Sequence, residues 1–237
     1  MLGIAAYRIS LLLLFALLSS ACATRLDSAG FATTTVDAKY LLKTEVDRIA
    51  DINRAEVEAG LLRIAEKLYR RNPREWQHSG LASREAAMER LRVRASWPAL
   101  AGQRERLAAS LAFAEHYVDD RVGALMFGLL TMVDAAFEHK SDFYLLDSLN
   151  EIKLFNAARN MEIAVWKLNQ DRRRDGSFFL LANELDPLNR NLSFEREFGR
   201  LTGLLDFMAH VVADRNGRTV SRLTQSVATA IFLPVGF

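Results

Sequence analysis

Proline is nearly absent from the middle of this 237-residue chain, and that absence limits the folds open to it more than any other feature. The four prolines are Pro73, Pro98, Pro187 and Pro234, so residues 99–186 contain none. This stretch is rich in alanine, leucine, glutamate, arginine and methionine, which favour helix over strand. The composition therefore predicts a chain built from helices.

Apolar residues in three segments recur at spacings of three and four, which places them on one face of a helix. These faces are Val57, Leu61, Ile64 and Leu68; Leu154, Ala158, Met161, Val165 and Leu168; and Phe194, Phe198, Leu201, Leu205, Met208 and Val212. Pro73 should stop the first helix. Ser83 and Ser193 are expected N-caps, the latter of a helix that closes at Asn216-Gly217. Residues 178–181 are the one short apolar run that could form a strand.

The predicted fold class is all-α, with about seven helices in an irregular multi-helix bundle or a divergent helical-hairpin array. Two segments, 65–73 (AEKLYRRNP) and 180–187 (LLANELDP), support the second form. Each resembles the last turn and closing proline of a tetratricopeptide-type repeat. No regular period near 34 residues links the two segments, which favours the irregular bundle.

Two further runs lack charge. Val122–Val133 lies between Arg121 and Asp134 and is too short to span a bilayer, so it predicts a central core helix covered on every side. Its alternative is a membrane-inserted helix. Residues 223–237 form an apolar tail, which should continue as helix to residue 233 and pack Val227, Ile231 and Phe232 onto the bundle. Membrane contact and partner binding are the alternatives for the tail.

The first residues have the pattern of an export signal. Arg8 is followed by an apolar core from Ile9 to Leu18 and then by the small residues 19–21, directly before Cys22. This resembles the lipobox of bacterial lipoproteins, in which the signal is removed and the cysteine is acylated. The resemblance implies lipidation at Cys22, and Ala23 in the following position implies the outer membrane. An uncleaved anchor, or cleavage without lipidation, is the alternative for the leader.

The predicted organisation is a signal peptide at 1–21, a lipidated N-terminus and tether at 22–36, and a helical domain at 37–237. The formal net charge of the whole chain is +2, which argues against a nucleic-acid binder because such a protein needs a concentrated basic face. Cys22 is the sole cysteine, so an exported form has no disulfide and must be stable through packing.

The sequence contains no recognisable catalytic, cofactor-binding or metal-binding motif. Two Glu-x-x-His motifs on separate helices, His-Glu-x-x-His, Gly-x-Ser-x-Gly, Ser-x-x-Lys and a glycine-rich phosphate loop are all missing. Acidic residues lie near histidines at His116 with Asp119 and Asp120, at Glu138 with His139, and at Asp206 with His210. We interpret them as solvated helix faces. The basic run at 172–174 is a solvated loop or a contact for anionic lipid or an acidic partner.

We therefore expect a non-enzymatic helical lipoprotein, tethered to the outer membrane and facing the periplasm, that serves as an interaction or assembly module for an envelope protein. The alternative is an accessory protein that holds a lipid or small hydrophobic ligand between its helices. An enclosed cavity of several hundred cubic ångströms would favour the ligand carrier, and a filled core the interaction module. An enzyme with a dispersed active site is the third alternative.

Overall fold

The computed structural model describes residues 23–26, 32–35, 43–144, 148–184, 191–217 and 231–235. The chain divides into two compact units, one of residues 1–48 with 143–147 and one of residues 49–142 with 148–237. In the first unit, β1 (Ala23–Leu26) pairs antiparallel with β2 (Ala32–Thr35), with Ala23 opposite Thr35. These strands fall inside the segment predicted to be a tether, where the sequence indicated no regular structure.

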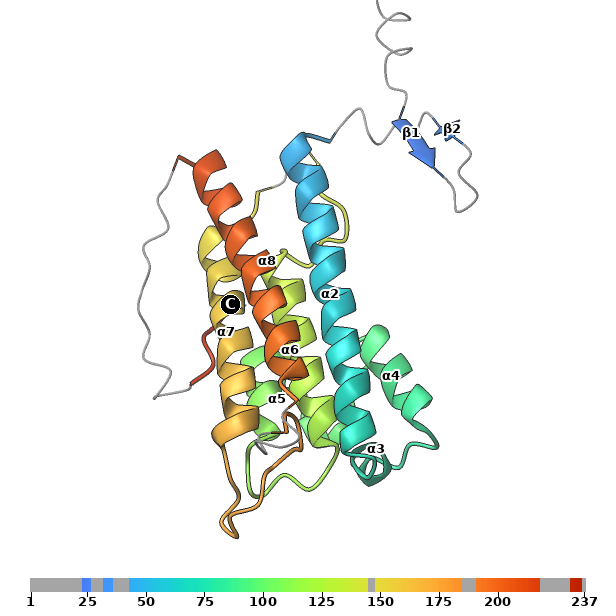
Figure 1. The fold of residues 1–237 in the computed structure, drawn as a ribbon, viewed down its shortest axis with the longest axis vertical. Coiled ribbons are helices and arrows are strands. Elements are labelled where there is room, and N and C mark those ends of the chain that lie inside the picture. The colour runs from blue at the N-terminus through green and yellow to red at the C-terminus, as the bar shows by residue number, and fades with distance from the viewer. Residues whose placement is uncertain are drawn as a thin grey trace, which may run out of the picture. The chain divides into compact units, whose positions relative to one another are not determined.

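The second unit is helical, which confirms the predicted all-α class. Its elements are α2 (Glu45–Arg71, which begins in the first unit), α3 (Glu75–His78), α4 (Arg84–Arg92), the 3-10 helix η2 (Pro98–Leu100), α5 (Glu105–Leu111), α6 (Arg121–Ala136), α7 (Glu151–Gln170) and α8 (Ser193–Arg215). The long helices α2, α6, α7 and α8 run alongside one another (Figure 1). Among the described residues, no helix is both long and apolar enough to cross a membrane.

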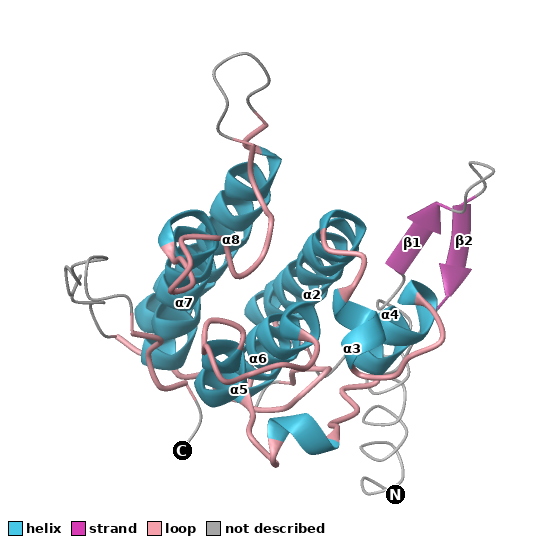
Figure 2. Cartoon of the chain, turned by 90° about the horizontal axis from the view of Figure 1, so that it is seen from below, coloured by secondary structure: helices cyan, strands magenta, loops and turns pink. Residues whose placement is uncertain are grey.

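Helix α6 is the centre of this unit, as its uncharged sequence predicted. It packs against α3, α4, α5 and α7, and every one of its residues is buried. The end-on view in Figure 2 shows α6 and α5 between the α7–α8 pair and the elements α2, α3 and α4. Gly128 lets α5 approach closely, because a Cβ there would lie 2.6 Å from the carbonyl oxygen of Glu105. A helix covered on all sides needs no polar face.

The three predicted apolar faces are confirmed, since all their residues are buried in α2, α7 and α8. The Ser83 hydroxyl caps α4 by accepting a hydrogen bond from the Ala86 N–H, and α8 ends at Asn216 with Gly217 in the left-handed conformation. The expected Ser193 cap is wrong. Ser193 is already the first helical residue, and the distant Asn183 side chain accepts the hydrogen bond of the Phe194 N–H instead.

Two other local predictions need correction. Residues 178–181 form no strand: a single bridge joins Phe178 to Arg172, and a turn lies between them. Residues 180–184 form no helix either, and the rest of the tetratricopeptide-like segment 180–187 lies outside the described residues. Segment 65–71 does end a helix. Phe179 and Leu180 are buried, which accounts for the apolar run without regular structure.

Only residues 231–235 of the tail lie among the described residues, and they are not helical. Phe232 is buried as expected, whereas Ile231 is 67% exposed, contrary to the prediction. Val227 lies outside the described residues. Residues 231–235 therefore dock without helical structure, and Pro234, which lacks an N–H, fits such a conformation better than the interior of a helix.

Candidate functional site

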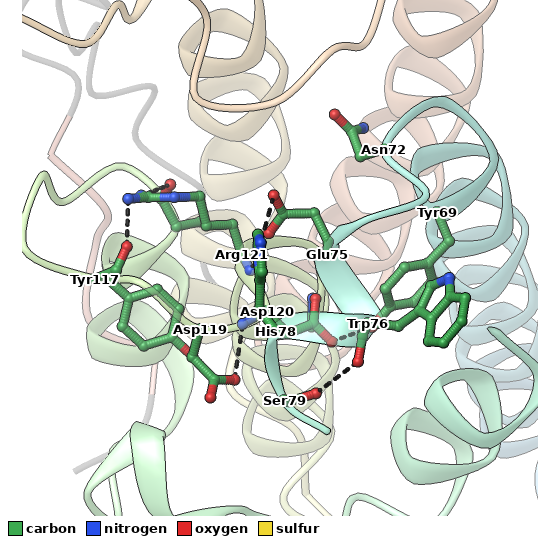
Figure 3. Close-up of polar contacts among 12 residues, drawn as sticks. Tyr69, Asn72, Glu75, Trp76, His78, Ser79, Tyr117, Asp119, Asp120 and Arg121 are labelled. Carbon is green, nitrogen blue, oxygen red and sulfur yellow. Dashed lines mark hydrogen bonds and ion pairs between the residues drawn. The ribbon is translucent and has the colours of Figure 1, made fainter. Parts of the chain in front are cut away.

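Ion pairs and hydrogen bonds concentrate at the two ends of α6, and the N-terminal end is the more buried. Asp120 caps the helix, its Oδ1 accepting a hydrogen bond from the Gly123 N–H at 2.7 Å. Its Oδ2 accepts one from the Tyr69 hydroxyl at 2.8 Å and one from Arg90 Nη2 at 2.6 Å. The carboxylate has no solvent exposure. One acidic side chain thus joins α2, α4 and α6; Figure 3 shows Asp120 and Tyr69.

The side chain of the next residue, Arg121, points away from Asp120 and binds the loop before α6. Its guanidinium donates to the carbonyl oxygens of Ala112, Ala114 and Tyr117, while its backbone N–H donates to Glu75 Oε2 at 2.7 Å. Figure 3 shows Glu75 reaching this N–H from α3. Arg121 is 3% exposed, so its charge takes the place of water as the partner of three backbone groups. We call Asp120, Arg121, Glu75, Tyr69 and Arg90 the N-terminal cluster.

Burial sets the protonation behaviour of this cluster. It raises the pKa of Asp120 and of Glu75 above their ordinary values, and hydrogen bonds to each carboxylate oppose the rise. Burial and the nearby charge of Asp120 also raise the pKa of the Tyr69 hydroxyl. Burial lowers the pKa of Arg121. The hydrogen bonds that the protein supplies to both carboxyls thus act against the effect of burial.

Beside the cluster lies a surface pocket of about 390 Å³. Its lining is Ala99, Ala101, Gln103, Leu111, His116, Tyr117, Val118 and Asp119. Asp119 Oδ1 accepts a hydrogen bond from Trp97 Nε1 at 3.0 Å, so this indole N–H is not available to Tyr117. The Tyr117 hydroxyl is buried without a hydrogen-bond partner, and burial raises its pKa. Mixed apolar and polar walls of this kind suit a small side chain of a partner protein.

The C-terminal end of α6 carries a ring of ion pairs, which we call the C-terminal ring. Asp134 pairs with Arg54 at 3.0 Å and with Arg94 at 3.1 Å, each through a different carboxylate oxygen. Glu58 closes the ring with Arg94 at 2.8 Å and Arg54 at 3.7 Å. Asp134 lies in the last helical turn, where a negative charge opposes the helix dipole, and the two arginines compensate for it.

The ring forms one wall of a pocket of about 320 Å³ whose rim includes Arg92 and His139. Helices α4 and α6 both end here with a non-glycine residue in the left-handed region, Arg94 at φ 53° and Glu138 at φ 53°, followed in α6 by His139 at φ 57°. In each case the last turn closes with the paired backbone hydrogen bonds of a Schellman motif. Left-handed backbone costs a non-glycine residue roughly 1–2 kcal/mol. The left-handed residue Arg94 is also the one whose side chain pairs with Glu58 and Asp134 in the C-terminal ring.

These sites hold and position charge. Among the described residues, no hydrogen bond joins a histidine to a serine or threonine hydroxyl, and no group of three metal-ligating side chains comes together. The Ser79 hydroxyl donates to the Trp76 carbonyl and accepts from Arg90. The geometry suits recognition of a polar or charged partner group.

The residues singled out from the sequence have different outcomes. Cys22, the predicted lipidation site, lies outside the described residues. Asp206 does not pair with His210, as it binds Arg159 from α7. The loop at 172–174 is a turn closed by Asp175 and Gly176, and Arg172 stacks 3.3 Å from the centre of the Phe178 ring. One cation of this loop is therefore partly used inside the protein.

Neither the N-terminal cluster nor the C-terminal ring was predicted from the sequence. Asp119 and Asp120 were considered only as neighbours of His116, which is exposed. The available signal was local: Asp120 directly precedes an uncharged helix, the position where an aspartate side chain caps the first turn. The arginines of the ring gave no such signal, because Arg54, Arg94 and Asp134 are far apart in sequence.

Comparison with known proteins adds no further identification. No protein-family model matches the chain, and neither the curated proteins nor the solved structures gave a match.

Proposed function

We propose that this protein is a lipoprotein tethered to the outer membrane through Cys22, whose helical body faces the periplasm and binds another envelope protein. The leader supports the tether: an apolar core, small residues 19–21 and a single cysteine stand in the order that export and acylation require. Two or three buried acyl chains hold a protein durably at a membrane.

The observation that carries the binding role is the aromatic packing around α6 in the described part of the chain. Phe127, Phe137, Phe194 and Phe198 are completely buried, and the Trp97 ring packs edge-on against Phe127 with centroids 5.7 Å apart. These aromatic side chains occupy the space between the helices that a hydrophobic ligand would need. The core thus favours the interaction module over the ligand carrier.

The surface pockets point the same way. The pockets of about 320, 390 and 550 Å³ are all lined in part by charged or amide side chains, and solvent reaches residues in each lining. Val118, on the rim of the 390 Å³ pocket, is 82% exposed. An exposed apolar side chain next to a polar recess is typical of a protein contact surface.

The tether is tested by replacing Cys22. A Cys22→Ser chain should lose labelling by a fatty-acid analogue and remain unprocessed or become soluble, whereas a Ser28→Ala chain should behave as the wild type. Labelling that survives Cys22→Ser would disprove the lipid anchor.

The binding role is tested by crosslinking in the native envelope. A photoreactive residue at Val118 should crosslink to an envelope protein that mass spectrometry identifies. The same residue at Gly176, in the exposed turn after the arginines, is the control and should give less of that product. Equal crosslinking from both positions would argue against a specific surface around Val118.

A further inference from the structure

The end of the chain is bound by two asparagine side chains of α7. Asn160 has no solvent exposure, and its amide contacts both backbone groups of one tail residue: Oδ1 accepts from the Leu233 N–H at 2.6 Å, and Nδ2 donates to the Leu233 carbonyl at 2.9 Å. Asn156, one helical turn earlier, donates to the Pro234 carbonyl at 3.0 Å. A side-chain amide that carries both a donor and an acceptor can read an extended backbone in this way.

Two side chains of the docked segment are buried. Phe232 is 3% exposed and Val235 is fully buried, whereas Ile231 is 67% exposed and Pro234 is exposed. The docked segment therefore has one aromatic anchor and, three residues later, one aliphatic anchor. Figure 1 shows its trace beside α7. We call this surface, made by Asn156, Asn160 and the sites of the two anchors, the α7 groove.

The groove recognises the main chain through hydrogen bonds and selects side chains only at the two anchors. The three hydrogen bonds use backbone groups that any extended segment offers, and Pro234 fits because only its carbonyl is used. Extended peptides bound by other proteins follow the same division, with main-chain bonds for affinity and pockets for specificity. A segment of another protein could make the same contacts.

We infer that the α7 groove is a peptide-binding site for a partner that presents an extended segment with an aromatic residue three positions before an aliphatic one, and that the chain's own residues 232–235 occupy it in competition. This inference rests on the proposed role as an interaction module, and it specifies the kind of peptide segment that the module binds. Residues 218–230 connect the docked segment to the end of α8. The tail is linked to the same protein, and for a short linker its effective concentration at the groove is on the order of millimolar. A partner peptide must compete with the tail, so its affinity for the wild-type protein is lower than its affinity for an unoccupied groove.

The test uses full-length protein in lipid nanodiscs and a fluorescent peptide with the sequence of residues 229–237. Phe232→Ser with Val235→Ser in the protein removes both anchors of the tail without changing α7. This variant should bind the peptide at least about tenfold more tightly than the wild type. Adding Asn160→Leu should abolish the gain, and a peptide with serine at both anchor positions should not bind. Equal affinity of wild type and tail variant, or no binding by the tail variant, would overturn the inference.

A second measurement covers the case in which the tail variant does not fold. A spin label placed at the exposed position 231 by Ile231→Cys, in a Cys22→Ser background, reports on the docked tail of an otherwise unchanged chain. Excess unlabelled peptide should increase the mobility of the label, and unchanged mobility at saturating peptide would overturn the inference. Peptide binding without an envelope crosslink would retain the groove and reject the proposed function. A crosslink without peptide binding would do the reverse.

Discussion

Each end of α6 places an acidic side chain beside arginines, but the two ends differ in burial and in how the acidic charge relates to the helix dipole. At the N-terminal end, Asp120 is completely buried and agrees with the helix dipole, because its charge lies beside the free N–H groups of the first turn. At the C-terminal end, Asp134 is 8% exposed, opposes the dipole and needs two arginines. The Asp120 carboxylate is closed off from solvent, whereas Asp134 lines a pocket.

This difference separates charges that are shut off from solvent and stabilise the fold from charges that solvent and salt ions can reach. A buried carboxylate is expensive unless every oxygen has a partner, and Asp120 meets that condition. The C-terminal ring shares its pocket with Arg92 and His139, so ions and solvent reach its surroundings. We expect its contribution to depend on salt, and that of the N-terminal cluster to depend little on salt.

The largest effect should come from Asp120→Ala. The change removes the cap of α6 and leaves Tyr69 and Arg90 without their shared partner, so we expect a loss of about 3–5 kcal/mol in the free energy of unfolding. Urea unfolding of both chains measures it. Asp214→Ala, at an exposed aspartate in α8, is the matched control and should change stability little. A loss below about 1 kcal/mol would mean that the buried charge is not needed.

Asp134→Ala should cost less, about 1–3 kcal/mol, because Glu58 still pairs with both arginines. The loss should shrink when unfolding is measured at high salt, since the wild-type ring is screened there. The Asp120→Ala loss, measured in the same buffers, should remain nearly constant. Equal salt dependence of the two losses would remove the distinction between the two ends.

His139→Gly should stabilise the protein by less than about 1 kcal/mol. Glycine tolerates the left-handed backbone at φ 57°, although its greater freedom in the unfolded chain offsets part of the gain. Thermal unfolding gives the sign. His116→Gly, at an exposed histidine, is the comparison, and a His139→Gly protein that melts at a lower temperature than the wild type would show that its side chain contributes to the pocket.

Glu75→Gln should have the smallest effect, visible as a change in pH dependence. Burial raises the folded-state pKa of Glu75 above its unfolded value, so between the two values the folded protein binds more protons than the unfolded chain. Stability from this group is thus present at low pH and is lost as the pH rises through the folded-state pKa. Glutamine keeps the acceptor for the Arg121 N–H but cannot ionise. Unfolding measured across this pH range should show a flatter decline for the variant, and an unchanged decline would assign the pH dependence to another group.

The sequence was sufficient for the helices because their signals are local. The 3–4 spacing from Phe194 to Val212 and the uncharged run of α6 depend only on nearby residues, and both are confirmed. The Ser193 prediction was wrong because the hydrogen bond of the Phe194 N–H is accepted by Asn183, a residue from another segment. The ring was beyond prediction for the same reason: its pairs join residues up to 80 positions apart, and charge alone does not show which arginine meets which carboxylate.

The docked tail also has a consequence for the order in which this protein is completed. Synthesis runs from the N-terminus, so α7 leaves the ribosome before residues 232–235 are released. Until then, the buried amide of Asn160 lacks the Leu233 backbone that satisfies it, and the sites of Phe232 and Val235 are empty. Every newly made molecule therefore passes through a stage in which its helices are complete and its α7 groove is vacant.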